Sequence, residues 1–471
     1  MQKRRKHWSK WEIGDEYWPD DFLVSLSWDT PFLSEQDSNI RVDECYLAIF
    51  AHEYMHYFHN VSTVSGFKSI LLTQKLVTAF TQTLMVNKDG TSVGSTALDE
   101  ASTAVEFVGR ERTFLDGQLG PAGTCTETDD DFDVEILSSN VEVEEREVDF
   151  GEGQPTKWPK VTATVEYTVN GRVASEQFVV GSVVIEESVV FALERLIAQQ
   201  LQIPLFECPT FPYKYLDHLV EQELKINSLA VVAALGTLAL LSPHPGAELA
   251  ELFESYKTKA AFQSKLEPLE VIDLLVEERS EQFEKAVEVI RADLKDLVTI
   301  REGREFTKGA LCFLQETVSR NLEARLEDPI FDVRRLASGL TKQNLSNFHI
   351  ENPCDLLQAR SGDERTFMRD LLTSFFPNGN KVTTYLRTLQ AQQVYVKAHV
   401  ERGWDAFKTS EQAEAPCPYL TCCHLNKRRD SFDTCSTKPW EHFERNGQNC
   451  WYGVGVAETL GESSLRSHTE E

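Results

Sequence analysis

The sequence lacks any apolar stretch long enough to cross a membrane. Its longest uncharged apolar run, Leu229–Leu241, has 13 residues, whereas a spanning helix needs about 20. We therefore interpret this run as a buried core helix. The basic opening, Lys3–Lys6, is not followed by an apolar run, so we expect no secretory signal peptide.

Basic side chains are scarce relative to acidic ones. Lys and Arg total 47 against 75 Asp and Glu, which gives a net charge of −28. A field of this sign repels phosphate, so binding to nucleic acid or to an anionic membrane is not expected. The same field favours a basic polypeptide as substrate or partner.

Several common signatures of function are absent. The sequence has no Walker-type phosphate loop, no G-x-S-x-G elbow and no Rossmann fingerprint. Ten cysteines without an export signal indicate reduced thiols or metal ligands rather than a disulfide framework. These features together predict a cytoplasmic protein.

The composition that remains is that of a folded protein, with 41% hydrophobic and 26% charged residues. The patterns predict an α+β fold that is predominantly helical. We divide it into an N-terminal region (1–125), an acidic β insertion (126–181), a helical region (182–400) and a Cys-rich tail (401–471). The oligomeric state is not predictable from these patterns.

Local patterns predict the main elements. A strand is expected over 22–28, and helices over 42–62, 67–86 and 97–107. In the acidic insertion, Asn170–Gly171 separates two alternating segments, which predicts a hairpin because both central residues of a type I′ turn need positive φ. The charged side chains of this insertion are expected on a solvated sheet face. Ser182 is expected to cap the helix that follows.

The stretch His52-Glu53-Tyr54-Met55-His56 carries the strongest chemical signal. Residues four apart on a helix project from the same face, so His52 and His56 can coordinate one Zn²⁺. Glu53 can then hold the water in the open position and accept its proton. The flanking residues are apolar, and two histidines and a glutamate in a buried helix are costly unless they are paired or bind metal.

This pentapeptide resembles the HExxH motif of the zincin metallopeptidases. The metzincin branch continues HExxHxxGxxH, but here the corresponding positions are His59 and Ser62. The resemblance is therefore to the gluzincins, and it implies a zincin-like catalytic core in which a Glu on a later helix completes the zinc site. It covers the motif helix and one further helix.

The resemblance makes Glu187 the preferred third ligand, because it precedes a small residue in an otherwise apolar helix. Glu186 and Glu100 are the alternatives. Glu194, two turns after Glu187, is expected to orient a ligating histidine.

Four further side chains could serve this site. His59 could contact substrate, stabilise an oxyanion or donate to a buried carboxylate. Donation to a buried carboxylate, or simple packing, is the preferred interpretation. Tyr213, Tyr215 and His218 are candidates for an oxyanion donor, and nothing in the sequence selects among them.

The tail presents a second candidate metal site. Cys417, Cys422, Cys435 and Cys450 could form a structural zinc site, with Cys423 competing with its neighbour Cys422. Their irregular spacing leaves buried, reduced packing cysteines as the alternative.

The sequence as a whole favours a zinc-dependent metallopeptidase that hydrolyses polypeptides, with one catalytic zinc and a second, structural zinc in the tail. Two alternatives stay open. One is a non-catalytic, zinc-stabilised regulatory or protein-binding protein, although Glu53 would then have no use. The other is a helical scaffold in which the motif is incidental.

Overall fold

The computed structural model places most of the chain. It describes residues 16–18, 23–27, 47–86, 91–94, 98–122, 134–149, 155–205, 208–300, 304–351, 356–361, 364–367, 379–402, 407–408, 417, 419, 435 and 450–460.

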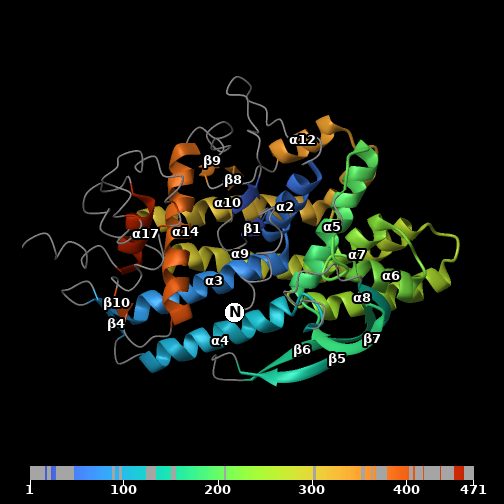
Figure 1. Ribbon diagram of the computed structural model, residues 1–471, viewed down its shortest axis with the longest axis horizontal. Helices are drawn as coiled ribbons and strands as arrows, with labels where there is room; N and C mark the ends of the chain where they lie inside the picture. Colours follow the sequence, from blue (N-terminus) through green and yellow to red (C-terminus); the bar gives the residue numbers. More distant parts are fainter. Residues whose placement is uncertain are drawn as a thin grey trace, which may run out of the picture.

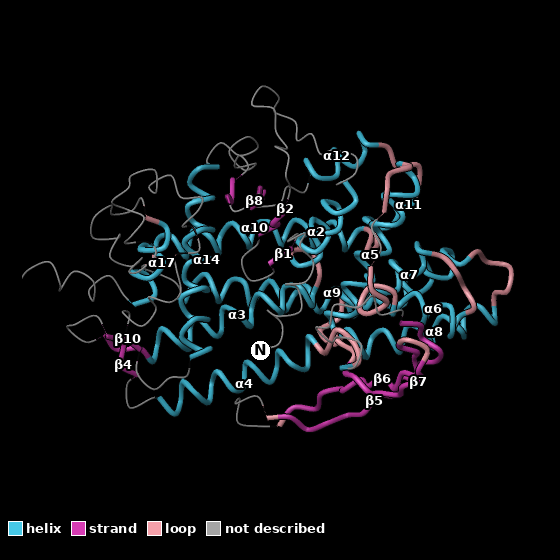
Figure 2. Tube along the Cα trace, viewed as in Figure 1, coloured by secondary structure: helices cyan, strands magenta, loops and turns pink. Residues whose placement is uncertain are grey.

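Helices make up most of the described chain (Figures 1 and 2), as the sequence predicted. They are α2 (Leu47–Asn60), α3 (Val64–Thr83), α4 (Leu98–Asp116), α5 (Ser182–Leu201), α6 (Tyr215–Leu224), α7 (Leu229–Leu240), α8 (Pro245–Phe262), α9 (Pro268–Ile300), α10 (Glu305–Glu327), α11 (Phe331–Ala337), α12 (Lys342–Glu351), α14 (Gly379–Arg402) and α17 (Trp451–Leu460).

Three small sheets accompany the helices. One has the order β1-β2-β8-β9, in which β2 (Leu23–Ser27) pairs in parallel with β8 (Leu356–Ser361) and the flanking pairs, with β1 (Glu16–Trp18) and β9 (Glu364–Phe367), are antiparallel. A second joins β10 (Phe407–Lys408), β4 (Thr91–Gly94) and β3 (Leu84–Val86). The third is antiparallel and comprises β5 (Val134–Val148), β6 (Thr156–Val169) and β7 (Arg172–Val179).

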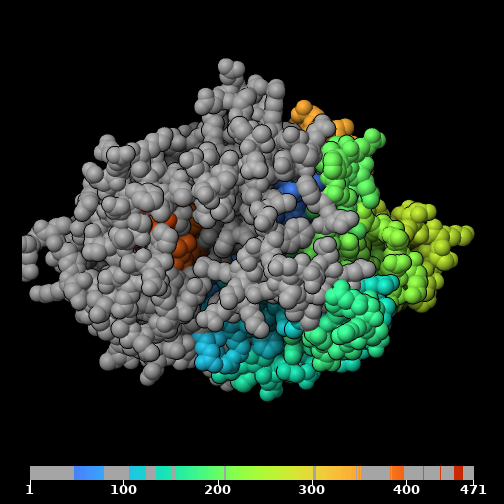
Figure 3. Space-filling model, viewed as in Figure 1, coloured from blue at the N-terminus to red at the C-terminus, as the bar shows by residue number. Residues whose placement is uncertain are grey.

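The β5–β7 sheet contains the hairpin that the sequence predicted. Asn170 and Gly171 have φ of 51° and 74°, which is the backbone that a type I′ hairpin requires. One face of β6 is buried through side chains such as Val161 and Val165, while the acidic side chains of β5 are largely exposed. The sheet lies along the lower edge of the face seen in Figure 3.

Helices α2, α5, α7 and α9 contribute much of the main hydrophobic core. All residues from Phe50 to Asn60 in α2 are buried, and a helix that is buried all round belongs to the interior rather than the surface. Helix α5 packs against both α2 and α7. Its valines have low helix propensity, so burial of its apolar side chains rather than local preference stabilises it.

The predicted helices form, with different ends. Helix α3 ends at Thr83, and the last three residues of its predicted range instead form β3. Helix α4 is longer than expected and reaches Asp116. The prediction that Ser182 caps α5 is wrong, because Ser182 is the first helical residue and the N-cap is Gly181, with no side-chain cap.

None of the described helices is by itself both long and apolar enough to cross a membrane. Helices α6 and α7 would meet that test only together, but they are bent by 103° relative to each other. From Val231 to Leu240, α7 is buried, which confirms the interpretation of this apolar run as a core helix.

Candidate metal centre

Helix α2 presents two imidazoles one turn apart on its buried length. The Nε2 atoms of His52 and His56 lie 3.2 Å apart, and the two rings are nearly perpendicular. Both residues are 8% exposed. The spacing of four residues in a Pro- and Gly-free helix is sufficient to bring these nitrogens together.

Helix α5 adds a carboxylate to the same point. Glu187 Oε2 lies 3.3 Å from His56 Nε2 and 3.8 Å from His52 Nε2. Two ligands on a tetrahedral zinc with bonds of about 2.0–2.1 Å are separated by about 3.4 Å. This separation is close to the 3.2 and 3.3 Å distances and somewhat shorter than the 3.8 Å distance. Glu187 Oε2 is buried and lacks a hydrogen bond of normal geometry, so it suits a cation that it would share with the two imidazoles.

Among the residues that the structure describes, this trio is the one group whose ligand atoms all lie within 4.8 Å of one another. The group could therefore hold a metal ion. Glu186 faces a different atom of the site, and the side chain of Glu100, on α4, lies outside the described part of the chain. The geometry thus favours Glu187 among the three acids that the sequence left open.

The other ring nitrogen of each histidine contacts an acid from α5. His52 Nδ1 lies 2.9 Å from Glu194 Oε2, and His56 Nδ1 lies 3.1 Å from Glu186 Oε1. An Nδ1–H that donates to a carboxylate leaves the Nε2 lone pair directed toward the metal position and makes the imidazole a stronger ligand. The predicted orienting role of Glu194 agrees with this contact.

The acids also control protonation of the site. Burial alone would lower the pKa of His52, but Glu187 and Glu194 outweigh it and raise that pKa to about 9. Burial alone would also lower the pKa of His56, but Glu187 and Glu186 outweigh it and raise that pKa well above its usual value. Burial alone would raise the pKa of Glu187, but His56 and His52 lower it to about 2. A site of this charge balance favours cations.

Tyr213 lies beside the imidazole of His52. Its ring centroid is 5.8 Å from that of His52 and 5.6 Å from that of Phe191. Burial, together with the charges of Glu187 and Glu53, raises the pKa of Tyr213 well above its usual value. The hydroxyl therefore keeps its proton at neutral pH and can donate a hydrogen bond near the metal position.

The two other candidates for this donor face elsewhere. The Tyr215 hydroxyl is buried and lies 3.1 Å from Ser139 Oγ on β5. His218 Nε2 lies 3.2 Å from Gln222 Oε1, one turn further along α6. Of the three candidates, Tyr213 is therefore the one that the structure brings next to the imidazoles.

His59 does not join the imidazole pair. It is 1% exposed, and its Nε2 donates to Asp332 Oδ2 at 3.0 Å. The preferred interpretation, donation to a buried carboxylate, is confirmed. The sequence analysis did not identify Asp332 or its partner Arg325, since they lie 273 and 266 positions from His59 and carry no recognisable motif.

The cysteines of the tail are described in part. Cys417, Cys435 and Cys450 are buried free thiols in one apolar cluster, whereas Cys422 and Cys423 lie outside the described residues. The Cys417 N–H donates to the Cys435 carbonyl at 3.0 Å, and the Gly453 N–H donates to Cys450 Sγ at 3.3 Å. The first contact links Cys417 with Cys435, and all three described cysteines belong to one apolar cluster. Their sulfur atoms do not all lie within 4.8 Å of one another, and zinc binding there stays a prediction.

Comparison with known proteins provides no relative: no family model, curated protein or solved structure matches the chain.

Proposed function

We propose that this protein is a zinc-dependent peptidase of gluzincin-like type. The observation that carries the proposal is the set of three distances among His52 Nε2, His56 Nε2 and Glu187 Oε2, which are close to those around a tetrahedral zinc. Two imidazoles and one carboxylate form a donor set that suits zinc and leaves a fourth position open.

When bound, the metal would supply a water of lowered pKa and polarise a carbonyl. Glu53 follows His52 directly and is buried. In this mechanism it accepts the proton of the attacking water and passes it to the leaving amine. Tyr213 donates its hydroxyl proton in a hydrogen bond to the oxyanion that forms on the carbonyl.

The remaining parts of the proposal follow from chemistry outside the site. The net charge of −28 favours basic polypeptides as substrates, since the field of the chain attracts them. A cytoplasmic location is part of the same proposal and fits the reduced state of the described cysteines.

The decisive experiment compares wild type with Glu53→Gln. We expect Glu53→Gln to retain its zinc and to lose about 10²–10⁴-fold in cleavage rate, because the amide cannot accept a proton. Zinc is measured by elemental analysis of purified protein, and cleavage by mass spectrometry of a peptide library incubated with each protein.

Two controls accompany this comparison. The double variant His52→Ala, His56→Ala should lose both zinc and cleavage, while Glu288→Gln, at an exposed position on α9, should change neither. Equal cleavage by wild type and Glu53→Gln would contradict the proposal. Zinc binding without any cleavage by wild type would leave the non-catalytic, zinc-stabilised binding protein as the function.

A further inference from the structure

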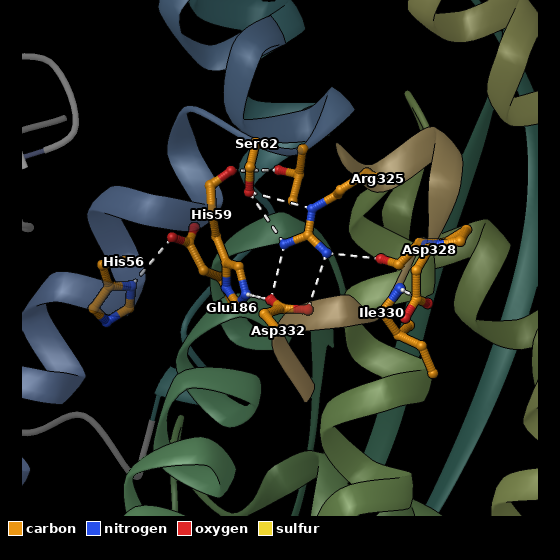
Figure 4. Close-up of polar contacts among 10 residues, drawn as sticks. His56, His59, Ser62, Glu186, Arg325, Asp328, Ile330 and Asp332 are labelled. Atoms are coloured by element: carbon orange, nitrogen blue, oxygen red, sulfur yellow. Dashed lines mark hydrogen bonds and ion pairs between the residues drawn. The ribbon is translucent and has the colours of Figure 1, made fainter. Parts of the chain in front are cut away.

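A buried polar cluster lies just beyond the metal centre, at the C-terminal end of α2 (Figure 4). It comprises His59, Ser62, Arg325 from α10 and Asp332 from α11, each at most 1% exposed. A charged pair this deeply buried costs desolvation free energy and often adds no net stability compared with apolar residues. Since stability alone does not explain the pair, its place beside the candidate site suggests that it positions residues of that site.

Hydrogen bonds link the four side chains of the cluster. Arg325 binds both oxygens of Asp332, at 2.8 and 3.1 Å, in a forked arrangement. The guanidinium also donates to Ser62 Oγ and to the Pro329 carbonyl. Asp332 Oδ2 accepts in addition from His59 Nε2. The orientation of the His59 imidazole thus depends on Asp332, which Arg325 holds in place.

Further contacts attach this end of α2 to α10. The Asn321 side chain donates to the Val61 carbonyl at 3.2 Å. The Arg325 guanidinium also lies over the Phe58 ring, 5.4 Å from its centroid. Contacts at positions 58, 59, 61 and 62 therefore limit both rotation and sliding of α2.

The segment around α11 is also bonded to α5, the helix that carries Glu187. Gln200, near the end of α5, donates to the Leu336 carbonyl at 2.6 Å and accepts from the Leu340 N–H at 2.7 Å. The segment that contains Asp332 is thus bonded to α2 through His59 and to α5 through Gln200. It connects the helix that carries the two imidazoles with the helix that carries Glu187.

We propose that Arg325 and Asp332 are positioning residues for the metal site, which act through His59 to set the position of α2 relative to α5. His59 lies one turn beyond His56 on the same rigid helix, so a shift at His59 moves both imidazoles relative to Glu187. The inference rests on the metal site of the proposed function, but it concerns metal affinity rather than cleavage.

The test measures metal binding to His59 variants of the full chain. His59→Leu removes the donor to Asp332 but leaves the Arg325–Asp332 pair intact, and we expect zinc to bind about tenfold more weakly, as is typical when a group that orients a ligand is lost. His59→Gln places an amide N–H near the position of Nε2, so it should restore most of the affinity. Zinc affinity is measured by competition with a chromophoric chelator.

A second variant removes the cluster without leaving a buried charge. In Arg325→Met, Asp332→Leu both charges are replaced by apolar side chains of similar size, which keeps the fold. We expect weaker zinc binding and a changed visible absorption spectrum of the Co²⁺-loaded protein, because the ligand geometry relaxes. The matched control is Arg335→Gln. Arg335 lies on α11, as Asp332 does, and forms an exposed ion pair with Glu351 of α12. Its loss should leave zinc affinity and the Co²⁺ spectrum unchanged.

The outcomes separate this inference from the proposed function. Unchanged zinc affinity and Co²⁺ spectrum in His59→Leu and in the double variant would overturn the positioning role, whatever the cleavage activity. A loss of affinity in His59→Leu that His59→Gln does not restore would also overturn it. Failure of wild type to bind either metal would overturn the metal site itself, whereas binding without cleavage would overturn the peptidase alone.

Discussion

Single side chains determine how protons and a metal ion compete for the two imidazoles of the candidate site. Each imidazole has a carboxylate at Nδ1, and both Nε2 atoms share Glu187. In the absence of metal these acids hold protons on the imidazoles, since they raise the pKa of His52 to about 9 and that of His56 well above its usual value. A metal ion must displace those protons.

The zinc affinity should therefore rise with pH up to about 9. Each displaced proton contributes about a tenfold gain per pH unit, and the contribution of His52 ends once it has lost its proton at about pH 9. Zinc competition titrations between pH 6.5 and 9 measure this slope.

The metal-free protein should respond in the opposite direction. The raised pKa of His52 stabilises the fold below the ordinary histidine value of 6.5, and this contribution disappears as the pH rises through about 9. Melting temperatures after treatment with a chelator should fall over that window. A zinc affinity that does not change with pH would contradict the preceding prediction, and with it the view that the imidazoles hold protons in the metal-free site.

Close packing between helices holds the acids of α5 in place. Gly236 on α7 faces α5 and α6. An added Cβ there would lie 2.2 Å from Val189 Cγ2 of α5 and 2.8 Å from Leu216 Cδ2 of α6. Val189 lies between Glu187 and Glu194 in the sequence. The absence of a side chain at 236 therefore allows α7 to support the stretch of α5 that carries the metal-facing acids.

Gly236→Ala should destabilise the protein by about 1–3 kcal/mol, because overpacking forces the helices apart. The matched control is Gly109→Ala on α4, where an added Cβ meets nothing within 4 Å. That change should stabilise the fold by up to about 1 kcal/mol through helix propensity. Denaturant unfolding of both variants provides the comparison, and equal effects would argue against the tight α5–α7 contact.

At the scale of the whole molecule, helix α17 is hydrogen-bonded to α10, the helix that carries Arg325. Glu458 on α17 accepts hydrogen bonds from the Phe306 and Thr307 N–H groups at the start of α10, both at 2.8 Å. The far end of α10 carries Arg325. Helix α10 thus links the Cys-rich tail with the end of α2.

The tail should bind its own zinc. We expect two zinc ions per wild-type chain and one in Cys450→Ser, with cleavage retained, since Cys450 belongs to the tail cluster and not to the α2–α5 site. Elemental analysis measures both. A single zinc per wild-type chain that the Cys450→Ser variant keeps would show that the three buried thiols only pack.

Local geometry explains what the sequence alone determined. The four-residue spacing of His52 and His56 brings their imidazoles together in any continuous helix, and Asn170–Gly171 predicts its turn because few residues tolerate positive φ. Only the tertiary structure decided which acids face the imidazoles, that Tyr213 rather than Tyr215 lies beside them, and that Asp332 holds His59. Those contacts join residues more than a hundred positions apart, and they depend on how whole helices pack, which no local periodicity contains.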